Sequence, residues 1–342
     1  MFKEQLRKHR LIIIAVPVLA VICIALAVFL SGQKARNIKK LQSGTVSIVC
    51  GLDRKTGQLT DDVSVGSGFI FDYASPNKAT DNTGTLFVLT ANHNITSDNL
   101  LVRFNVDYTQ FKDSWYTPEV VYSDPTFDVA ILSFTVSEHD AIIKNVLKIA
   151  ESSNVKEGDT VYCSCTPKTP FLQSTLLDGK ITKTSVNGLA NQYLIMTDLP
   201  LSPGCSGSPI MNGKGEIIGM NCFESTEFGT EGMSFAIYAE RLNKIIDNYK
   251  NGVRPVDYGL EFEANFTGSD YAMFDYPGLI IKSISDTSYF KNTDLKVGDK
   301  IQSLNGNMLF TAADFYENLA PGTSITVTGE NRSGAVNIEF NP

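Results

Sequence analysis

The chain has 342 residues, of which 43% are hydrophobic and 19% charged, enough apolar material for about two folded domains. This composition excludes a wholly disordered or collagen-like chain. Residues 1–42 carry eight Lys or Arg and one Glu, a net charge of +7, so an overall charge of −8 leaves −15 on the remainder. An acidic body of this size repels phosphate backbones, and no nucleic-acid partner is expected.

The first predicted element is a transmembrane helix at residues 11–30, an uncharged run that reads LIIIAVPVLAVICIALAVFL. A helix of this length spans about 30 Å, the thickness of the hydrocarbon layer. The alternative is a cleaved signal peptide, but the apolar part of such peptides is only about 7–15 residues long. Residues 1–10 then form a cytoplasmic leader and 31–43 a polar linker. The larger body is expected outside the cytoplasm, although Lys and Arg are equally frequent on both sides of the span.

The body from residue 44 onward is predicted to be mainly β. Short β-branched or alternating runs separated by turn residues favour antiparallel barrels or sandwiches over a parallel α/β sheet. These runs lie at 45–50, 67–72, 86–91, 128–134, 159–165, 193–198 and 215–223. An apolar stripe predicts one helix at 239–250, which Asn251 and Gly252 end. Residues 256–342 read as a smaller block of strands with a short helix at 311–319.

The cysteines do not form a recognisable disulfide framework. Cys23 lies in the predicted span, and the other five cannot all pair within one chain. Cys163 and Cys165 alternate with other residues in a strand-like run, which suits small buried side chains. The sequence therefore predicts free thiols.

Three segments of the first domain together indicate nucleophilic catalysis: LTANHNI around His93, FDVAIL containing Asp128, and PGCSGSP around Ser206. A catalytic serine needs a base, an acid that orients this base, and donors for the developing oxyanion. Of three histidines in the chain, only His93 is well placed to be a general base. Gly204 and Gly207 allow a turn tight enough for the amides of Gly204 and Ser206 to face one point.

These segments resemble the three active-site motifs of chymotrypsin-fold serine proteases. The runs VGSGFIFD (65–72), GKGEIIGM (213–220) and EGMSFAI (231–237) are similar to segments of the HtrA branch, and residues 278–306 resemble a PDZ domain. The order of membrane anchor, protease and single PDZ domain is also that of membrane-anchored HtrA proteins. The resemblance covers about residues 44–342.

The resemblance implies a chymotrypsin-like double β-barrel, with two six-stranded barrels at 44–250, followed by a small α+β PDZ domain at 251–342. His93 would be the general base, Asp128 would orient its imidazole, and Ser206 would attack the scissile carbonyl. The backbone of Gly204, Cys205 and Ser206 would form the oxyanion hole. The family further implies a homotrimer without metal or organic cofactor, tethered in the bacterial envelope, that degrades unfolded or damaged proteins during stress.

Two binding regions are also implied. Met233, Ser234 and Phe235 lie in the segment that lines the substrate pocket in this family. The acid of a trypsin-like pocket normally lies six residues before the nucleophile, where this chain has Pro200, so small or medium aliphatic side chains are expected rather than Lys or Arg. Gly259 and Leu260 lie where the PDZ domain would hold the C-terminus of a peptide.

Several alternatives remain open. Asp124 is a rival acid for Asp128, and Cys205 is a rival nucleophile for Ser206. Cys205 stands where the family commonly has Asn, so its thiol either makes the enzyme redox-sensitive or is simply buried. The α/β-hydrolase motif G-x-S-x-G fails because Ser208 occupies its last position. At the level of function, a catalytically silent PDZ peptide-binding or chaperone protein and a lipase-like esterase are the competing hypotheses.

Overall fold

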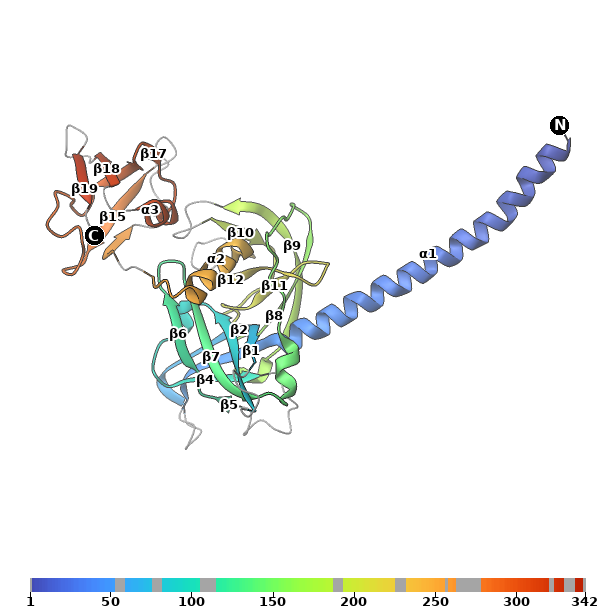
Figure 1. The fold of residues 1–342 in the computed structure, drawn as a ribbon, viewed down its shortest axis with the longest axis horizontal. Helices are drawn as coiled ribbons and strands as arrows, with labels where there is room; N and C mark the ends of the chain where they lie inside the picture. The colour runs from blue at the N-terminus through green and yellow to red at the C-terminus, as the bar shows by residue number, and fades with distance from the viewer. Residues whose placement is uncertain are drawn as a thin grey trace.

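The computed structural model describes residues 2–52, 59–75, 82–104, 115–186, 193–224, 232–255, 258–262, 278–319, 323–328 and 336–340. In the first of these ranges, side chains are described from residue 22 onward. Figure 1 shows a long N-terminal helix that projects from a β-rich body, with a smaller C-terminal sheet on the other side of this body.

The N-terminal helix α1 (Phe2–Gly44) runs without a break into the body. Residues 31–43, expected to be a linker, are its last turns. The reason is that Leu41 is fully buried and Ile38 packs beside it, so the end of the helix is fixed on the core, although residues 33–36, 39 and 40 are exposed. Among the described residues, no helix combines the length with the hydropathy that a membrane span requires. The side chains of residues 11–21, half of the predicted span, lie outside the described part, and the span stays a prediction.

The first half of the body is an antiparallel sheet with the strand order β5-β4-β1-β2-β3-β7-β6. The resemblance implied a six-stranded barrel, and the structure differs: the described strands form a seven-stranded sheet whose edge strands β5 and β6 do not pair with each other. Because β5 is only two residues long, it offers little edge for closure. The strands are β1 (Thr45–Leu52), β2 (Leu59–Ala74), β3 (Thr83–Thr90), β4 (Leu100–Phe104), β5 (Trp115–Tyr116), β6 (Glu119–Asp124) and β7 (Val129–Ser137).

The second half is a closed six-stranded barrel with the order β10-β13-β12-β11-β8-β9, as the resemblance implied. Its strands are β8 (Thr160–Cys165), β9 (Thr175–Val186), β10 (Leu194–Thr197), β11 (Pro209–Met211), β12 (Ile217–Glu224) and β13 (Ser234–Tyr238). Short 3₁₀-helices are η1 (Asn92–Asn94), η3 (Ala141–Asn145) and η4 (Pro170–Leu172). The barrel is filled by small apolar side chains, among them three cysteines, Cys163, Cys165 and Cys205. The described cysteines are all free thiols, which confirms that prediction.

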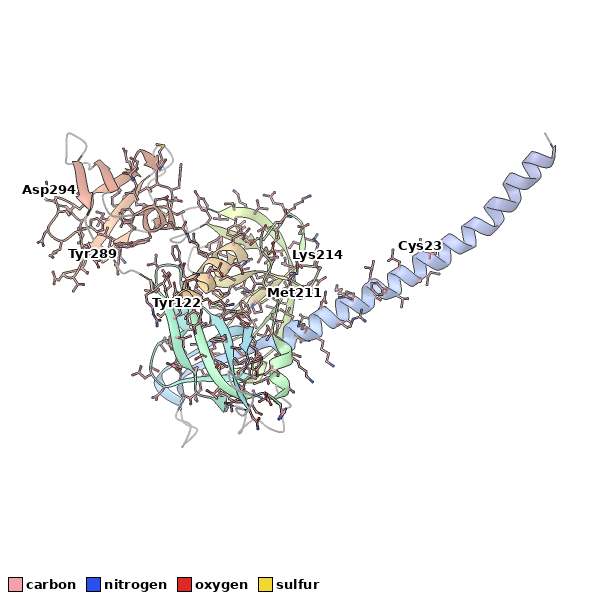
Figure 2. All side chains as sticks on the ribbon, in the orientation of Figure 1. Cys23, Tyr122, Met211, Lys214, Tyr289 and Asp294 are labelled. Carbon is pink, nitrogen blue, oxygen red and sulfur yellow. The ribbon has the colours of Figure 1, made fainter. Side chains whose placement is uncertain are left out.

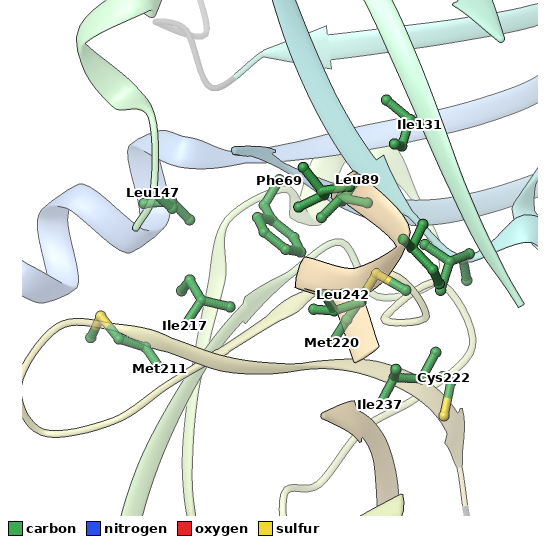
Figure 3. Packing of buried hydrophobic residues seen from close by; sticks show 14 of the residues in the cluster. Phe69, Leu89, Ile131, Leu147, Met211, Ile217, Met220, Cys222, Ile237 and Leu242 are labelled. Atoms are coloured by element: carbon green, nitrogen blue, oxygen red, sulfur yellow. The ribbon is translucent and has the colours of Figure 1, made fainter. Parts of the chain in front are cut away.

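A shared core joins the two halves. Phe69 and Leu89 from the first sheet pack in one cluster with Met220 from the barrel and Leu242 from helix α2 (Ala239–Lys250) (Figure 3). Helix α2 has the predicted bounds, because its apolar stripe is buried against this cluster. The seam between the two β-structures is therefore a packed interface that can hold residues from both halves in a fixed arrangement.

The C-terminal sheet has the order β14-β15-β16-β18-β19, and β17 pairs with β16. These strands are β14 (Leu260–Phe262), β15 (Leu279–Ile284), β16 (Lys300–Leu304), β17 (Asn307–Met308), β18 (Thr323–Thr328) and β19 (Val336–Phe340). The predicted short helix is α3 (Ala312–Asn318). Thr311 and Asp314 cap its N-terminus, because the side chain of each accepts the main-chain N–H of the other. Phe290 and Phe315 lie at the centre of a separate core. In Figure 2, the labels Tyr289 and Asp294 mark the connection between β15 and β16 in this C-terminal unit, and Tyr122 marks the body.

Ion pairs join helices α2 and α3. Glu317 of α3 accepts hydrogen bonds from both Arg241 and Lys244 of α2. The guanidinium of Arg241 also lies 4.2 Å from the centre of the Phe127 ring, at the end of the first sheet where Asp128 follows. Arg241 thus contacts both Glu317 of the C-terminal unit and Phe127, the residue that precedes Asp128.

Candidate active site

His93 and Asp128 are brought together by strand pairing. Strand β3 ends at Thr90 and β7 begins at Val129, and the antiparallel register places Thr90 opposite Ala130. The end of one strand therefore lies beside the start of the other. The 3₁₀-turn η1 follows β3 and carries His93, and the N–H of Asn92 in this turn donates to the carbonyl of Asp128 at 3.1 Å.

The carboxylate of Asp128 contacts His93 twice. Its Oδ1 accepts the main-chain N–H of His93 at 2.9 Å, and its Oδ2 lies 2.8 Å from the ring atom Nδ1. Asp128 has the unusual φ of 55°, a conformation that Asp adopts more readily than most residues. Since an ionised carboxylate only accepts, Nδ1 carries the hydrogen and Nε2 is left to accept a proton. The imidazole is thereby held in the tautomer and orientation of a general base.

Asp124, the rival acid, is engaged elsewhere. Its Oδ1 accepts the main-chain N–H groups of Thr126 at 3.0 Å and Phe127 at 3.1 Å, so it caps the turn before β7. Burial raises the pKa of Asp124, against the opposing effect of these hydrogen bonds and of Arg241. The geometry favours Asp128 as the partner of the imidazole.

Ser206 lies in the turn between β10 and β11, and its hydroxyl is half-buried beside the barrel. Oγ donates to the carbonyl of Cys222 at 3.4 Å, near the outer limit of hydrogen bonding. The main chain of Ser206 is tied to the first sheet, because its carbonyl accepts the N–H of Ser67 at 2.9 Å and the side-chain amide of Asn94 at 2.9 Å. Asn94 directly follows His93, so the serine turn and the histidine turn are in contact.

The amides of the serine turn divide into two groups. The N–H of Cys205 donates to Ser202 at 3.0 Å and that of Gly207 donates to Asn221 at 2.7 Å. Among the described residues, no acceptor receives the N–H of Gly204 or of Ser206. Of the three amides predicted for the oxyanion hole, that of Cys205 is thus already engaged, and only these two remain to bind an anion.

Gly207 must be glycine for a steric reason. It has a φ of 85°, and a Cβ atom there would lie 2.1 Å from the carbonyl oxygen of Ser67 and 2.7 Å from Oγ1 of Thr90. The first sheet therefore approaches the serine turn so closely that no side chain fits between them. This close approach keeps Ser206 at the seam of the two halves.

Cys205 points into the barrel. Its side chain is only 1% exposed and packs with Cys163 and Cys165. Hydrogen bonds with the thiols of Cys163 and Cys205, together with burial, raise the pKa of the Cys165 thiol far above its usual value. A thiol buried in the barrel among other thiols is a poor nucleophile and a poor target of oxidants, so the structure favours the buried-side-chain interpretation of Cys205.

The three predicted pocket residues have different environments. Met233 is 38% exposed, whereas Ser234 and Phe235 are buried in β13. The hydroxyl of Ser234 hydrogen-bonds with Thr197 at 2.6 Å, and Phe235 belongs to the shared core. Only the side chain of Met233 is therefore free to contact a substrate directly.

Gly259 and Leu260 lie at the start of the edge strand β14. The carbonyl of Leu260 already accepts the hydroxyl of Tyr316 from helix α3 at 2.6 Å. Tyr316 also stacks with Tyr258, at 5.8 Å between ring centres. An added peptide strand would use the carbonyls of this edge, so Tyr316 occupies part of the predicted peptide site.

A cavity of about 230 Å³ lies between α2 and α3 and is lined by Phe127, Arg241, Tyr258 and Glu317, among others. None of His93, Asp128 and Ser206 lines it, so it is distinct from the candidate active site. Within the described part of the chain, no group of three or more His, Cys, Asp or Glu side chains is arranged to hold a metal ion.

The sequence did not single out Ser67 as a residue of this site. Its N–H donates to Ser206, its hydroxyl donates to the carbonyl of Gly204 at 2.7 Å, and the same hydroxyl accepts the N–H of Thr166 at 2.9 Å. Ser67 therefore holds both ends of the serine turn from the opposite sheet. The only sequence signal was its place in the VGSGFIFD run, because contacts across more than a hundred residues leave no local pattern.

Comparison with known proteins finds related sequences. The trypsin-like peptidase domain family matches residues 66–220. The chain is 30% identical over 260 residues to a probable periplasmic serine endoprotease, DegP-like, of Pseudomonas fluorescens, an alignment that covers 73% of this chain and 49% of that protein. It is 25% identical over 264 residues to serine protease Do-like HtrB of Bacillus subtilis, covering 70% and 56%. The chain thus spans only about half the length of these curated relatives.

Solved structures show the same fold. The HtrA-type protease AlgW with decapeptide superimposes with a TM-score of 0.59 at 17% identity, over 90% of this chain and 98% of that one. The serine endoprotease from Yersinia pestis gives a TM-score of 0.55 at 18% identity, over 90% and 97%. Because the fold agrees along most of the chain and the sequence similarity covers the segments that meet at the seam, the chain belongs to the HtrA/DegP-like family of trypsin-fold serine proteases.

Proposed function

We propose that this chain is a serine endopeptidase in which Ser206 is the nucleophile, His93 the general base and Asp128 the acid that orients it. The pair of hydrogen bonds between His93 and Asp128 carries the proposal. It fixes the imidazole through both the main chain and the ring, at 2.9 and 2.8 Å, and leaves Nε2 ready to accept a proton.

The chemistry follows from this arrangement. Ser206 Oγ leaves its long contact with Cys222 and bonds to the substrate carbonyl carbon, while its proton moves to Nε2 of His93. The carbonyl oxygen becomes an oxyanion, which the amides of Gly204 and Ser206 bind. The C–N bond then breaks as His93 returns the proton to the leaving amine. Water hydrolyses the acyl-enzyme by the same steps, with His93 again acting as the base.

The preferred substrates are peptides with small or medium aliphatic side chains on the acyl side of the cleaved bond. Pro200 provides no charge at the position six residues before the nucleophile, and the exposed part of the pocket segment is the apolar side chain of Met233. A cleavage profile from a peptide library tests this proposal. A profile dominated by Lys or Arg would contradict it.

A fluorophosphonate probe tests the catalytic assignment, because it reacts with activated serines. We expect it to label the wild-type chain and to leave the Ser206→Ala variant unlabelled, and casein to be cleaved only by the former. If neither protein is labelled while C-terminal peptides still bind, the chain is a silent peptide-binding protein. Turnover of short acyl esters without casein cleavage would indicate an esterase.

The C-terminal unit, residues 251–342, is proposed to be a PDZ domain that captures the C-termini of proteins by strand addition at β14. Its support is the position of Gly259 and Leu260 at the start of an edge strand beside helix α3. Fluorescence polarisation with labelled peptides tests the proposal. Binding that requires a free C-terminal carboxylate would support it, and equal binding of amidated peptides would oppose it.

We further propose that residues 11–30 anchor the chain in the cell membrane, with the protease domain (44–250) outside the cytoplasm, where a homotrimer acts on unfolded or damaged envelope proteins. In the described part of α1, the side chains of Ile22, Leu26 and Phe29 are more than half exposed, which is unfavourable unless lipid or protein covers them. The full chain should stay in the membrane pellet at alkaline pH, and a chain beginning at residue 31 should be released. Release of both the full chain and the shortened chain would contradict the proposed membrane anchor.

A further inference from the structure

Asn94 has an unusual position for a residue next to a catalytic base. It ends the 3₁₀-turn η1 that carries His93, and it is only 5% exposed. Its side-chain Nδ2 donates to the carbonyl of Ser206 at 2.9 Å and to Oγ1 of Thr90 at 2.9 Å, and lies 3.3 Å from the carbonyl of Ser67. The carboxamide therefore connects the histidine turn, two strands of the first sheet and the serine turn.

The chain makes room for this side chain. A Cβ atom on Gly66 would lie 2.3 Å from Cγ of Asn94, so the carboxamide fills the space that Gly66 leaves in β2. The acceptors around Nδ2 are all oxygens, which only a donor can satisfy. Asn94 also begins an Asn-x-Thr sequence, the pattern of N-glycosylation sites. Because its side chain is buried, it cannot carry a glycan, and its carboxamide serves contacts within the protein.

We propose that Asn94 is a positioning residue of the active site, which holds Ser206 at the correct distance from His93 by bonding to the main-chain carbonyl of the serine. This inference rests on the proposed function, because it concerns the nucleophile named there.

The hydrogen bond acts on the nucleophile through a short covalent path. The carbonyl that Asn94 binds and the Oγ that attacks belong to the same residue, and Asn94 is the residue after His93. The N–H of Ser67 donates to the same carbonyl, so the orientation of Ser206 is set by two donors. If one donor is lost, the serine turn can move relative to the imidazole. A displacement of about 1 Å is enough to reduce an enzymatic rate about a hundredfold.

The test is the Asn94→Leu variant, since Leu has nearly the shape of Asn and lacks the donor. Labelling by a fluorophosphonate is followed over time at several probe concentrations, to obtain the maximal rate, the half-saturating concentration and the final fraction of chains labelled. We expect the maximal rate to fall about tenfold to a hundredfold, with half-saturation changed less than twofold. Labelling should still go to completion. The pH midpoint of the rate should match that of wild type, because both bonds between His93 and Asp128 are kept.

These readouts separate positioning from a loss of folded protein, which would lower the final fraction labelled and leave the rate of the remaining chains unchanged. The matched control is Asn243→Leu, since the side chain of Asn243 in helix α2 donates to a main-chain carbonyl outside the candidate active site, that of Ala150, at 2.8 Å. Its maximal rate should equal that of wild type. If Asn94→Leu does not fold, Asn94→Ala decides, with an expected loss of about threefold to tenfold because water can enter the smaller site.

A wild-type maximal rate in the folded Asn94 variants, or a loss confined to the fraction labelled, would overturn the inference. This result differs from a failure of the proposed function, in which the wild-type chain would not be labelled or the Ser206→Ala variant would be labelled equally well.

Discussion

Replacing Asp128 by Asn should abolish most of the activity while leaving the fold intact. The two oxygens of the carboxylate accept two donors, the main-chain N–H and the ring Nδ1–H of His93. A carboxamide has only one oxygen. If this oxygen keeps the main-chain N–H, its NH₂ group faces Nδ1, which must then lose its hydrogen. The proton moves to Nε2, and the imidazole can no longer accept the proton of Ser206.

The expected loss in the maximal labelling rate is about 10³- to 10⁴-fold, the size seen when a triad base is held in the wrong tautomer. This loss corresponds to about 4–5.5 kcal/mol of transition-state stabilisation. The fold should tolerate the change because Asn, like Asp, adopts the positive φ that residue 128 requires. Rates are measured with the fluorophosphonate probe, and unfolding is followed by urea titration.

Asp124→Asn is the matched control for this experiment. Its carboxamide oxygen can still accept the N–H groups of Thr126 and Phe127, so the labelling rate should stay within about threefold of wild type. A loss below tenfold in the folded Asp128 variant, or a larger loss in the Asp124 variant, would refute the assignment of the orienting acid.

Three further changes have definite expected outcomes. Gly207→Ala should lower the free energy of unfolding by about 2–5 kcal/mol, from a strained φ and overlap with the opposite sheet, whereas Gly213→Ala, with open space around it, should change urea unfolding little. Tyr316→Phe frees the carbonyl of Leu260 and should tighten the binding of C-terminal peptides about threefold to tenfold, as measured by fluorescence polarisation. Equal or weaker binding would contradict the conclusion that Tyr316 occupies part of the peptide site. Burial opposes the ionisation of Glu317, but hydrogen bonds from its two basic partners outweigh it and lower the pKa below 4.5. Ionised Glu317 therefore stabilises the folded chain at pH values above the pKa that this group has in the unfolded chain. This stabilisation is lost as the pH falls through the pKa of Glu317 in the folded chain. Glu317→Gln should reproduce this loss at neutral pH as faster proteolysis of the segment at 252–255, and unchanged proteolysis would count against it.

Local patterns in the sequence identified the elements that have a clear period or clear ends. Helix α2 was predicted with its observed bounds because the apolar stripe and the Asn251-Gly252 end both act locally. The strand that ends just before His93 and the strand that precedes Ser206 were found for the same reason. The meeting of His93 with Asp128 was predicted only through the family resemblance, because their contact depends on the register of β3 with β7.

The features that were missed depend on contacts between distant segments. The basic composition of residues 31–43 suggested a linker, because it does not reveal that Leu41 is fully buried against the body. Asn94 and Ser67 act through hydrogen bonds to the serine turn, more than a hundred residues away, and no periodicity reports such bonds. The closure of the peptide edge by Tyr316 likewise arises from the packing of α3 on β14.

The unbroken passage of α1 into the body has a mechanical consequence for a tethered protease. With residues 11–30 in a bilayer, the remaining helix up to Gly44 would extend about 20 Å before β1 begins. A helix resists bending and changes of length far more than a disordered tether does, so the candidate active site would keep one height and one tilt above the lipid surface. Polypeptides that are themselves attached to the membrane would then be cut at a set distance from it, and this distance would change in steps when helical residues are inserted or deleted.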